Sequence, residues 1–313
     1  MSAELVWRWL EAGELDLPAP GSGLTGTRLS KLAGLTEYDV VAGRLAEAHT
    51  DAAAILAELD GPPPSRDQLW GVWAAEAPDA VLRVDEQTSN SVLEGTKAWC
   101  SGAELCTHAL VTARRHDNTR GLYAVELSQA EVRPLTSSWR NAGMRDCDTR
   151  SVQFTNAVAT PVGRPGQYLD RPGFWHGAVG VAACWLGGAR GVAAPLYRAV
   201  GDEYRNGSDD VHTHAHLGAV DAALAAAEAI LASAACYIDA QLGDDRAELI
   251  ARRVRAVVEH AVDEAITRTG RALGPAPLAL DAKHAQRVAD LTMYVRQSHA
   301  ERDLAALGRA AAR

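Results

Sequence analysis

At 313 residues the chain is long enough for two or three packed units, because typical domains contain roughly 100–200 residues. The formal net charge of -9 and the lack of any block of Lys and Arg argue against nucleic acid or an anionic membrane as the main partner. The 5 cysteines form no Cys-x-x-Cys pair, which fits reduced thiols in the cytoplasm better than a disulfide framework. We therefore expect a cytoplasmic protein that binds neither nucleic acid nor membrane.

Residues 1–64 are predicted to form a short N-terminal helical domain. Apolar side chains recur there at three- and four-residue steps, as in Val41, Leu45, Ala48 and Ala52. The linker 61–64 contains three consecutive prolines, which cannot continue a helix. The first domain boundary is placed there.

Residues 65–166 are predicted to form a central β domain. Short runs of β-branched and other apolar residues alternate with turns, at 81–84, 91–100, 109–113, 122–127 and 152–154. Such regular spacing indicates an antiparallel β-sandwich or barrel.

Residues 167–313 are predicted to form a C-terminal four-helix bundle. Val220, Leu224, Ala227 and Leu231 follow helical steps, and the small residues between them permit close helix packing. The uncharged run 173–189 is Gly-rich and shorter than the roughly 20 residues that span a bilayer, so a buried helix is the better interpretation. The fold class is thus an α+β multidomain protein.

The segment 97–102 places an aromatic ring and a hydroxyl two residues apart, on what we interpret as a strand end. On a regular strand, Trp99 and Ser101 share one face. Alone, this pattern is most typical of an aromatic core residue followed by a turn. Two further motifs change that balance: Glu76 and Pro78 in the segment 69–78, and a polar turn at 139–150 before the strand 151–154.

The order of helices, β domain and helical bundle, together with these motifs, resembles the acyl-CoA dehydrogenase flavoprotein family over nearly the whole chain. The resemblance implies that Trp99 lies against the flavin ring and that Ser101 donates to its redox-active nitrogen. It also implies flavin contacts from the main chain of Ala74 and Ala75, where Ala75 replaces a family Thr. The implied cofactor is FAD.

A third motif concerns Arg205 and His216. The resemblance implies that Arg205 reaches the pyrophosphate of a flavin bound by a neighbouring subunit, with His216 at the position of a family Gln. A guanidinium suits a diphosphate because it stays charged and offers a planar fork of donors. A homodimer or homotetramer with a flavin site shared between subunits is therefore expected.

The resemblance breaks at the general base. Val295 stands where the family's dehydrogenases have a catalytic Glu. Valine cannot accept a proton, and loss of a positioned base typically lowers the rate by ~10²–10⁴. His299 and Asp303 are the nearest substitutes, and on a helix they would form an imidazole–carboxylate pair, although a solvated charged face is the more ordinary interpretation. The catalytic residue stays unknown.

No metal site is expected. His212, His214 and His216 would share a face on a strand, but on a helix they point apart, and the resemblance puts them on a loop entering a helix.

The favoured function is an FAD-binding oxidoreductase acting on CH–CH groups of an acyl thioester or a related small molecule, with an implied electron-transfer partner. Two alternatives remain open. One is a catalytically inactive homologue that serves as a binding or assembly subunit. Val295 and Ala75 are the sequence features that favour it. The other is a flavin-dependent monooxygenase, for which His299 is the sequence feature.

Overall fold

The computed structural model describes residues 2–86, 91–206, 210–240 and 246–312, without the side chains of residues 203–206. The chain forms two compact units. The strand unit contains residues 1–17, 45–140 and 145–174, and the helix unit contains residues 18–44, 141–144 and 175–313. The predicted division into segments 1–64, 65–166 and 167–313 stays a prediction.

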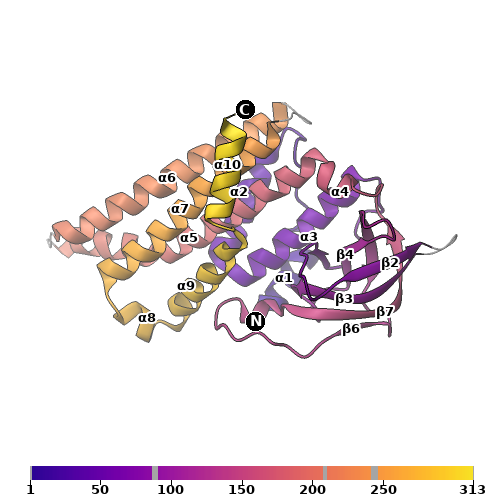
Figure 1. The fold of residues 1–313 in the computed structure, drawn as a ribbon. Coiled ribbons are helices and arrows are strands. Elements are labelled where there is room, and N and C mark those ends of the chain that lie inside the picture. The colour runs from indigo at the N-terminus through magenta and orange to yellow at the C-terminus, as the bar shows by residue number, and fades with distance from the viewer. Residues whose placement is uncertain (1, 87–90, 207–209, 241–245, 313) are drawn as a thin grey trace. The chain divides into compact units, whose positions relative to one another are not determined.

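The strand unit is built around a seven-stranded sheet. Its strands are β1 (Trp70–Trp73), β2 (Leu82–Glu86), β3 (Ser91–Cys100), β4 (His108–Arg114), β5 (Arg120–Glu126), β6 (Val132–Pro134) and β7 (Arg150–Pro161). The order β4-β2-β3-β7-β5 closes on itself because β5 also pairs with β4. This closed arrangement agrees with the predicted barrel (Figure 1).

The expectation of a wholly antiparallel sheet is wrong in one respect. Strand β1 pairs with β4 in parallel, and β2 meets β4 in parallel at the single pair Arg83 and Arg114. The reason is that the β2–β3 hairpin lies between them in sequence, so the chain has turned back twice before β4 begins.

The barrel core follows the alternation of β-strands. On β3, Leu93 and Lys97 share the inward parity and both are buried. Their apolar neighbours include Trp73, Val111, Tyr123, Val152 and Phe154. A second apolar cluster joins Ile55 and Leu56 of helix α3 (Val40–Glu58), and Leu59 just beyond it, to side chains of β1, β4 and β5.

The remaining elements of the strand unit are short. They are α1 (Ser2–Glu11), the 3-10 helix η1 (Arg145–Cys147) and α4 (Gln167–Asp170). Beyond α4, the buried Arg171 forms an ion pair with Glu58, which also accepts from the Gly173 N–H. These contacts connect the end of α3 to the end of the strand unit.

The helix unit confirms the predicted C-terminal bundle (Figure 1). Its helices are α2 (Thr25–Tyr38), α5 (Pro172–Asn206), α6 (Val211–Ala240), α7 (Ala247–Leu273), α8 (Ala276–Leu280), α9 (Ala282–Tyr294), η2 (Val295–Gln297) and α10 (Glu301–Ala311). Small residues permit close packing: a Cβ at Gly187 of α5 would clash with the Ala33 carbonyl of α2. Asp239 of α6 accepts from the Thr25 hydroxyl and N–H, which holds the start of α2.

Two described helices are long and apolar enough to cross a membrane by length and composition alone, Pro172–Asp202 and Val211–Ala240. The apolar window of the first is 78% buried, as expected for a core helix, and that of the second is 33% buried. The absence of a membrane partner stays a prediction.

Candidate functional site

Trp99 is the most unusual side chain of the strand unit. It is 58% exposed and has a φ of 61°, in the left-handed region that bulky residues rarely adopt. The register of β3 against β7 shifts between Lys97 and Cys100, so a β-bulge turns the chain at this point. The regular alternation that predicted a shared face for Trp99 and Ser101 therefore does not extend through Trp99.

Ser101 follows this bulge in a turn that is held firmly. The Trp73 indole N–H donates to the Ser101 carbonyl at 2.9 Å, and the Gly102 N–H donates to the Cys147 carbonyl at 2.8 Å. The Ser101 hydroxyl lies 3.1 Å from the Thr149 hydroxyl, and either can be the donor. The Ser101 and Thr149 hydroxyls thus lie close to each other, and Ser101 lies two residues along the chain from the exposed Trp99.

A second indole accompanies Trp99. Trp139, on the segment before η1, contacts the Trp99 ring edge-on, with 6.4 Å between ring centroids and an interplanar angle of 86°. Edge-to-face contact is a favoured arrangement of aromatic rings. The contact with Trp139 therefore restricts the orientation of the Trp99 ring, although that ring is largely exposed to solvent.

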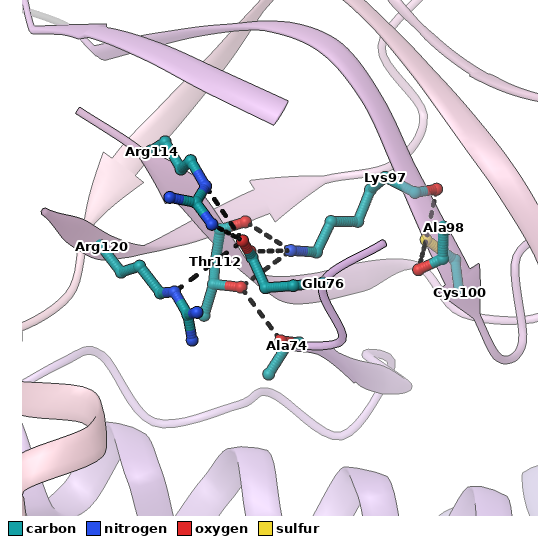
Figure 2. Close-up of polar contacts among 8 residues, drawn as sticks. All are labelled: Ala74, Glu76, Lys97, Ala98, Cys100, Thr112, Arg114 and Arg120. Atoms are coloured by element: carbon teal, nitrogen blue, oxygen red, sulfur yellow. Dashed lines mark hydrogen bonds and ion pairs between the residues drawn. The ribbon is translucent and has the colours of Figure 1, made fainter. Parts of the chain in front are cut away.

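The strand unit also contains a cluster of polar side chains whose centre, Lys97 and Thr112, is buried (Figure 2). The Lys97 ammonium, whose side chain is 2% exposed, donates to the Thr112 carbonyl and hydroxyl, each at 2.8 Å, and to the Glu76 carboxylate at 3.3 Å. The Thr112 hydroxyl in turn donates to the Ala74 carbonyl at 3.4 Å. Of the two residues predicted to contact the flavin through their main chain, Ala74 is therefore hydrogen-bonded through its carbonyl to the buried Thr112. Ala75 is exposed.

The charges of this cluster support one another. Burial by itself would raise the pKa of Glu76, but the charges of Lys97, Arg120 and Arg114 hold that pKa below its ordinary value. Burial lowers the pKa of Lys97, and Glu76 opposes this change. Arg114 contacts the Glu76 carboxylate at 2.9 Å, so Glu76 bridges a buried cation and a surface cation.

In the helix unit, the position expected for a base is apolar. Val295 is 1% exposed and begins η2. The preceding Tyr294 contacts the buried Trp185 edge-on, with 6.3 Å between ring centroids. The Arg255 guanidinium lies over the Trp185 indole, 4.4 Å from its centroid. This packing offers no carboxylate at residue 295.

His299 and Asp303 do come together. His299 Nδ1 lies 3.6 Å from Asp303 Oδ1, and the His299 main-chain N–H donates to Asp303 Oδ2 at 3.0 Å. The His299 side chain is 65% exposed and precedes α10 rather than lying within it. The pair is therefore a solvated contact at a helix start, and its catalytic role stays a prediction.

The predicted diphosphate contacts lie around the connection of α5 and α6. Arg205 is on the last turn of α5, and its side chain lies outside the described part of the structure. His216 is half-buried on α6, and its Nδ1 has no hydrogen-bond partner among the described residues.

The three histidines of this region, His212, His214 and His216, lie within α6 and not on a loop, which corrects that expectation. Helical geometry turns successive residues by about 100°, so His214 points away from His212 and His216, which lie four residues apart on one face of α6. No group of three or more His, Cys, Asp or Glu within the described ranges is arranged to hold a metal ion.

A charged cavity of about 380 Å³ lies within the helix unit, between α2, α5 and α6. Its charged side chains largely contact one another: Arg190 donates to Glu228 at 2.5 Å, and the Tyr197 hydroxyl donates to Asp221 at 2.8 Å. Because these side chains bond to one another, they give no indication of a ligand for this cavity.

Three solved structures of this fold are similar to the chain. The dibenzothiophene monooxygenase TdsC from Paenibacillus sp. A11-2, in complex with FMN and indole, is 18% identical with a TM-score of 0.78, over 98% of this chain and 94% of that one. An electron transferring flavoprotein of Acidaminococcus fermentans is 14% identical with a TM-score of 0.84, over 99% and 90%. Butyryl-CoA dehydrogenase from Megasphaera elsdenii is 15% identical with a TM-score of 0.82, over 99% and 90%.

No protein-family model matches the chain, and no curated protein matches it by sequence. The similar structures therefore establish the fold.

The sequence interpretation missed four side chains around the candidate site: Lys97, Thr112, Trp139 and Thr149. Lys97 had a usable signal, because it shares the strand parity of Leu93 and so predicts a buried cation with a partner. Thr112, Trp139 and Thr149 carry no such local signal, because their contacts come from distant segments.

Proposed function

We propose that this chain, which has the fold of acyl-CoA dehydrogenase-like flavoproteins, binds a flavin and acts as an oxidoreductase on a small molecule. The observation that carries the proposal is Trp99, an exposed indole held in a strained left-handed conformation two residues before Ser101, whose hydroxyl lies 3.1 Å from that of Thr149. Backbone strain of this kind costs about 1–3 kcal/mol and concentrates at functional sites. A planar ligand that stacks on the indole would account for both the strain and the exposure.

The residues present fit a flavin ring. A bound flavin supplies two-electron chemistry, which the side chains of this chain cannot supply themselves. Trp99 would cover one face of the ring, Trp139 would hold the Trp99 indole, and Ser101 would donate to the reactive edge, with Thr149 orienting its hydroxyl. The exposed main chain at Ala75 would contact the ring without any side chain.

The first experiment is the visible absorption spectrum of the purified protein, followed by release and chromatographic identification of the cofactor. Stoichiometric flavin is the expected result. Trp99→Ala should weaken flavin binding by about 5- to 150-fold, since base–aromatic stacking is typically worth about 1–3 kcal/mol. Tyr38→Ala removes a comparably exposed aromatic ring, 61% exposed, and should leave the affinity unchanged. A colourless protein that stays empty when FAD or FMN is added would overturn the proposal and favour the binding-subunit alternative.

A flavin-dependent monooxygenase is the second candidate function, and buried Val295 favours it. A dehydrogenation of a CH–CH group needs an acceptor for the proton, and residue 295 supplies none. A reaction that uses oxygen does not need a base at that position. If substrate turnover stops under anaerobic conditions, the monooxygenase is supported; if turnover continues with an artificial electron acceptor, the dehydrogenase with an electron-transfer partner is supported.

The same proposal extends to the form of the flavin, the location of the protein and its assembly. We propose FAD as the cofactor, a cytoplasmic location, and a homodimer or homotetramer in which Arg205 and His216 contact a diphosphate bound by a neighbouring copy. The partnerless Nδ1 of His216 supports this assignment, because buried polar atoms normally have partners. Light scattering of the purified protein tests the assembly, and a loss of FAD but not FMN affinity in Arg205→Gln tests the diphosphate contact.

A further inference from the structure

The two segments proposed to contact the flavin come from different strands. Ala74 and Ala75 follow β1, whereas Trp99 lies at the end of β3 and Ser101 follows it. Strand β1 pairs with β4, and β3 pairs with β2 and β7. The ladder hydrogen bonds of these pairs therefore do not set the position of one segment relative to the other directly.

The Trp73 indole N–H, which donates to the Ser101 carbonyl, makes one connection between the two segments. Lys97 and Thr112 make a second connection, which reaches the Ala74–Glu76 loop itself. Lys97 lies on β3, two residues before Trp99, and its ammonium reaches Thr112 of β4 and Glu76 of the loop after β1 (Figure 2). The Thr112 hydroxyl accepts from Lys97 and donates to the Ala74 carbonyl. A hydroxyl has one donor and two acceptor sites, so both contacts are compatible.

All three ammonium hydrogens of Lys97 have acceptors: the Thr112 carbonyl, the Thr112 hydroxyl and the Glu76 carboxylate. An ammonium in this state has no free lone pair, so Lys97 is not a nucleophile or a proton acceptor there. Its contribution is geometric.

A merely structural purpose does not explain a buried lysine at this point. Replacing a buried ion pair by apolar side chains of similar volume is often neutral or stabilising. The barrel core around Lys97 is otherwise apolar, with Leu93 at the same strand parity. What an apolar side chain could not provide is the set of directed contacts to Thr112 and Glu76.

We propose that Lys97 is a positioning residue for the flavin site, which holds the Ala74–Glu76 loop at a fixed distance from the Trp99 ring through Thr112 and Glu76. This inference rests on the proposed function. It predicts that the loop and the ring move apart when Lys97 loses its donors, although neither segment is itself changed.

The test uses Lys97→Met and Thr112→Val in the full chain. Methionine keeps most of the apolar stem, and valine keeps the shape of threonine. In each variant we expect a loss of flavin affinity of about tenfold and a shift of the visible band of the bound flavin, because the polar surroundings of the ring change. The double variant should lose little more than either single variant, since both substitutions break one shared connection.

Arg115→Met is the matched control. It removes a cation of the same unit that pairs with Glu86 at 2.7 Å and with Asp117, neither of which belongs to the Lys97 cluster. Flavin affinity within twofold of the wild type and an unchanged visible band are expected for this control.

A Lys97→Met protein that melts at a lower temperature but binds flavin with wild-type affinity and an unchanged band would overturn the inference, because Lys97 would then be structural only. If that variant does not fold, the same result for Thr112→Val would overturn it. A wild-type protein that binds no flavin would instead defeat the proposed function, so the two failures are distinguishable.

Discussion

The strand unit and the helix unit hold their interiors in different ways. The strand unit buries polar side chains with directed partners, such as Lys97 with Thr112 and His49 with the Trp70 N–H. The helix unit also buries polar side chains with partners, such as Asp290 with the Met144 N–H, but small residues give it close helix contacts, such as Gly187 against Ala33, and the position expected for a base, Val295, is apolar. The difference teaches that the strand unit presents the proposed ligand-facing surface, whereas residue 295, the position expected for a base, lies in the apolar core of the helix unit.

The largest expected effect tests the polar interior of the strand unit through pH. His49 is buried, and its Nδ1 accepts from the Trp70 N–H at 3.2 Å. Burial lowers its pKa from 6.5 to about 4, against the raising effect of Asp16. The unfolded chain therefore binds the His49 proton first as the pH falls, and stability is lost between pH 6.5 and 4.

At about 1.4 kcal/mol per pKa unit, this loss amounts to about 3 kcal/mol between pH 7 and 4. His49→Gln should remove this part of the pH dependence, so the difference between the urea-unfolding curves of the two proteins isolates it. A difference that stays flat across this pH range would contradict the prediction.

The second effect tests the close packing of the helix unit. Gly187→Ala places a methyl group against the Ala33 carbonyl, which is main chain and cannot swing away. Overpacking of this kind typically costs about 1–3 kcal/mol, and we expect about 2 kcal/mol by thermal or urea unfolding.

Gly218→Ala is the matched control on α6, where nothing lies within 4 Å of the added methyl group. It should stabilise the protein by about 0.5–1 kcal/mol, because alanine is the better helix former. Equal destabilisation by both substitutions would mean that the α2–α5 contact is not tight.

The smallest effect concerns His299. Its contact with Asp303 is solvated, and exposed pairs of this kind contribute little, so His299→Gln should change the unfolding free energy by less than about 0.5 kcal/mol. A larger change would show that the start of α10 depends on the imidazole. A loss of turnover without a change in stability would instead support His299 as the catalytic candidate.

Much of the fold could be predicted from the sequence. The run of β-branched and apolar residues at 91–100 predicted the extent of β3, and the helical steps from Val220 onward lie in α6. The parallel pairing of β1 and β4 could not be predicted, because strand direction depends on how many times the chain turns between strands. The helical state of His212, His214 and His216 was also missed, because the resemblance placed them on a loop.

The candidate site was only partly predictable. Trp99 and Ser101 were identified by resemblance, but the left-handed conformation of Trp99 opposes its local preference and arises from the bulge against β7. The partners of Lys97 lie 15 and 21 residues away in sequence, so no local pattern reveals them.

The backbone conformation of Trp99 has a consequence for how this protein responds to selection. Glycine adopts a positive φ without steric strain, so Trp99→Gly would relieve the strain and remove an exposed apolar ring at once. A directed-evolution experiment that rewards heat resistance alone would therefore enrich the loss of Trp99, and only a simultaneous demand for ligand binding would keep the indole in place.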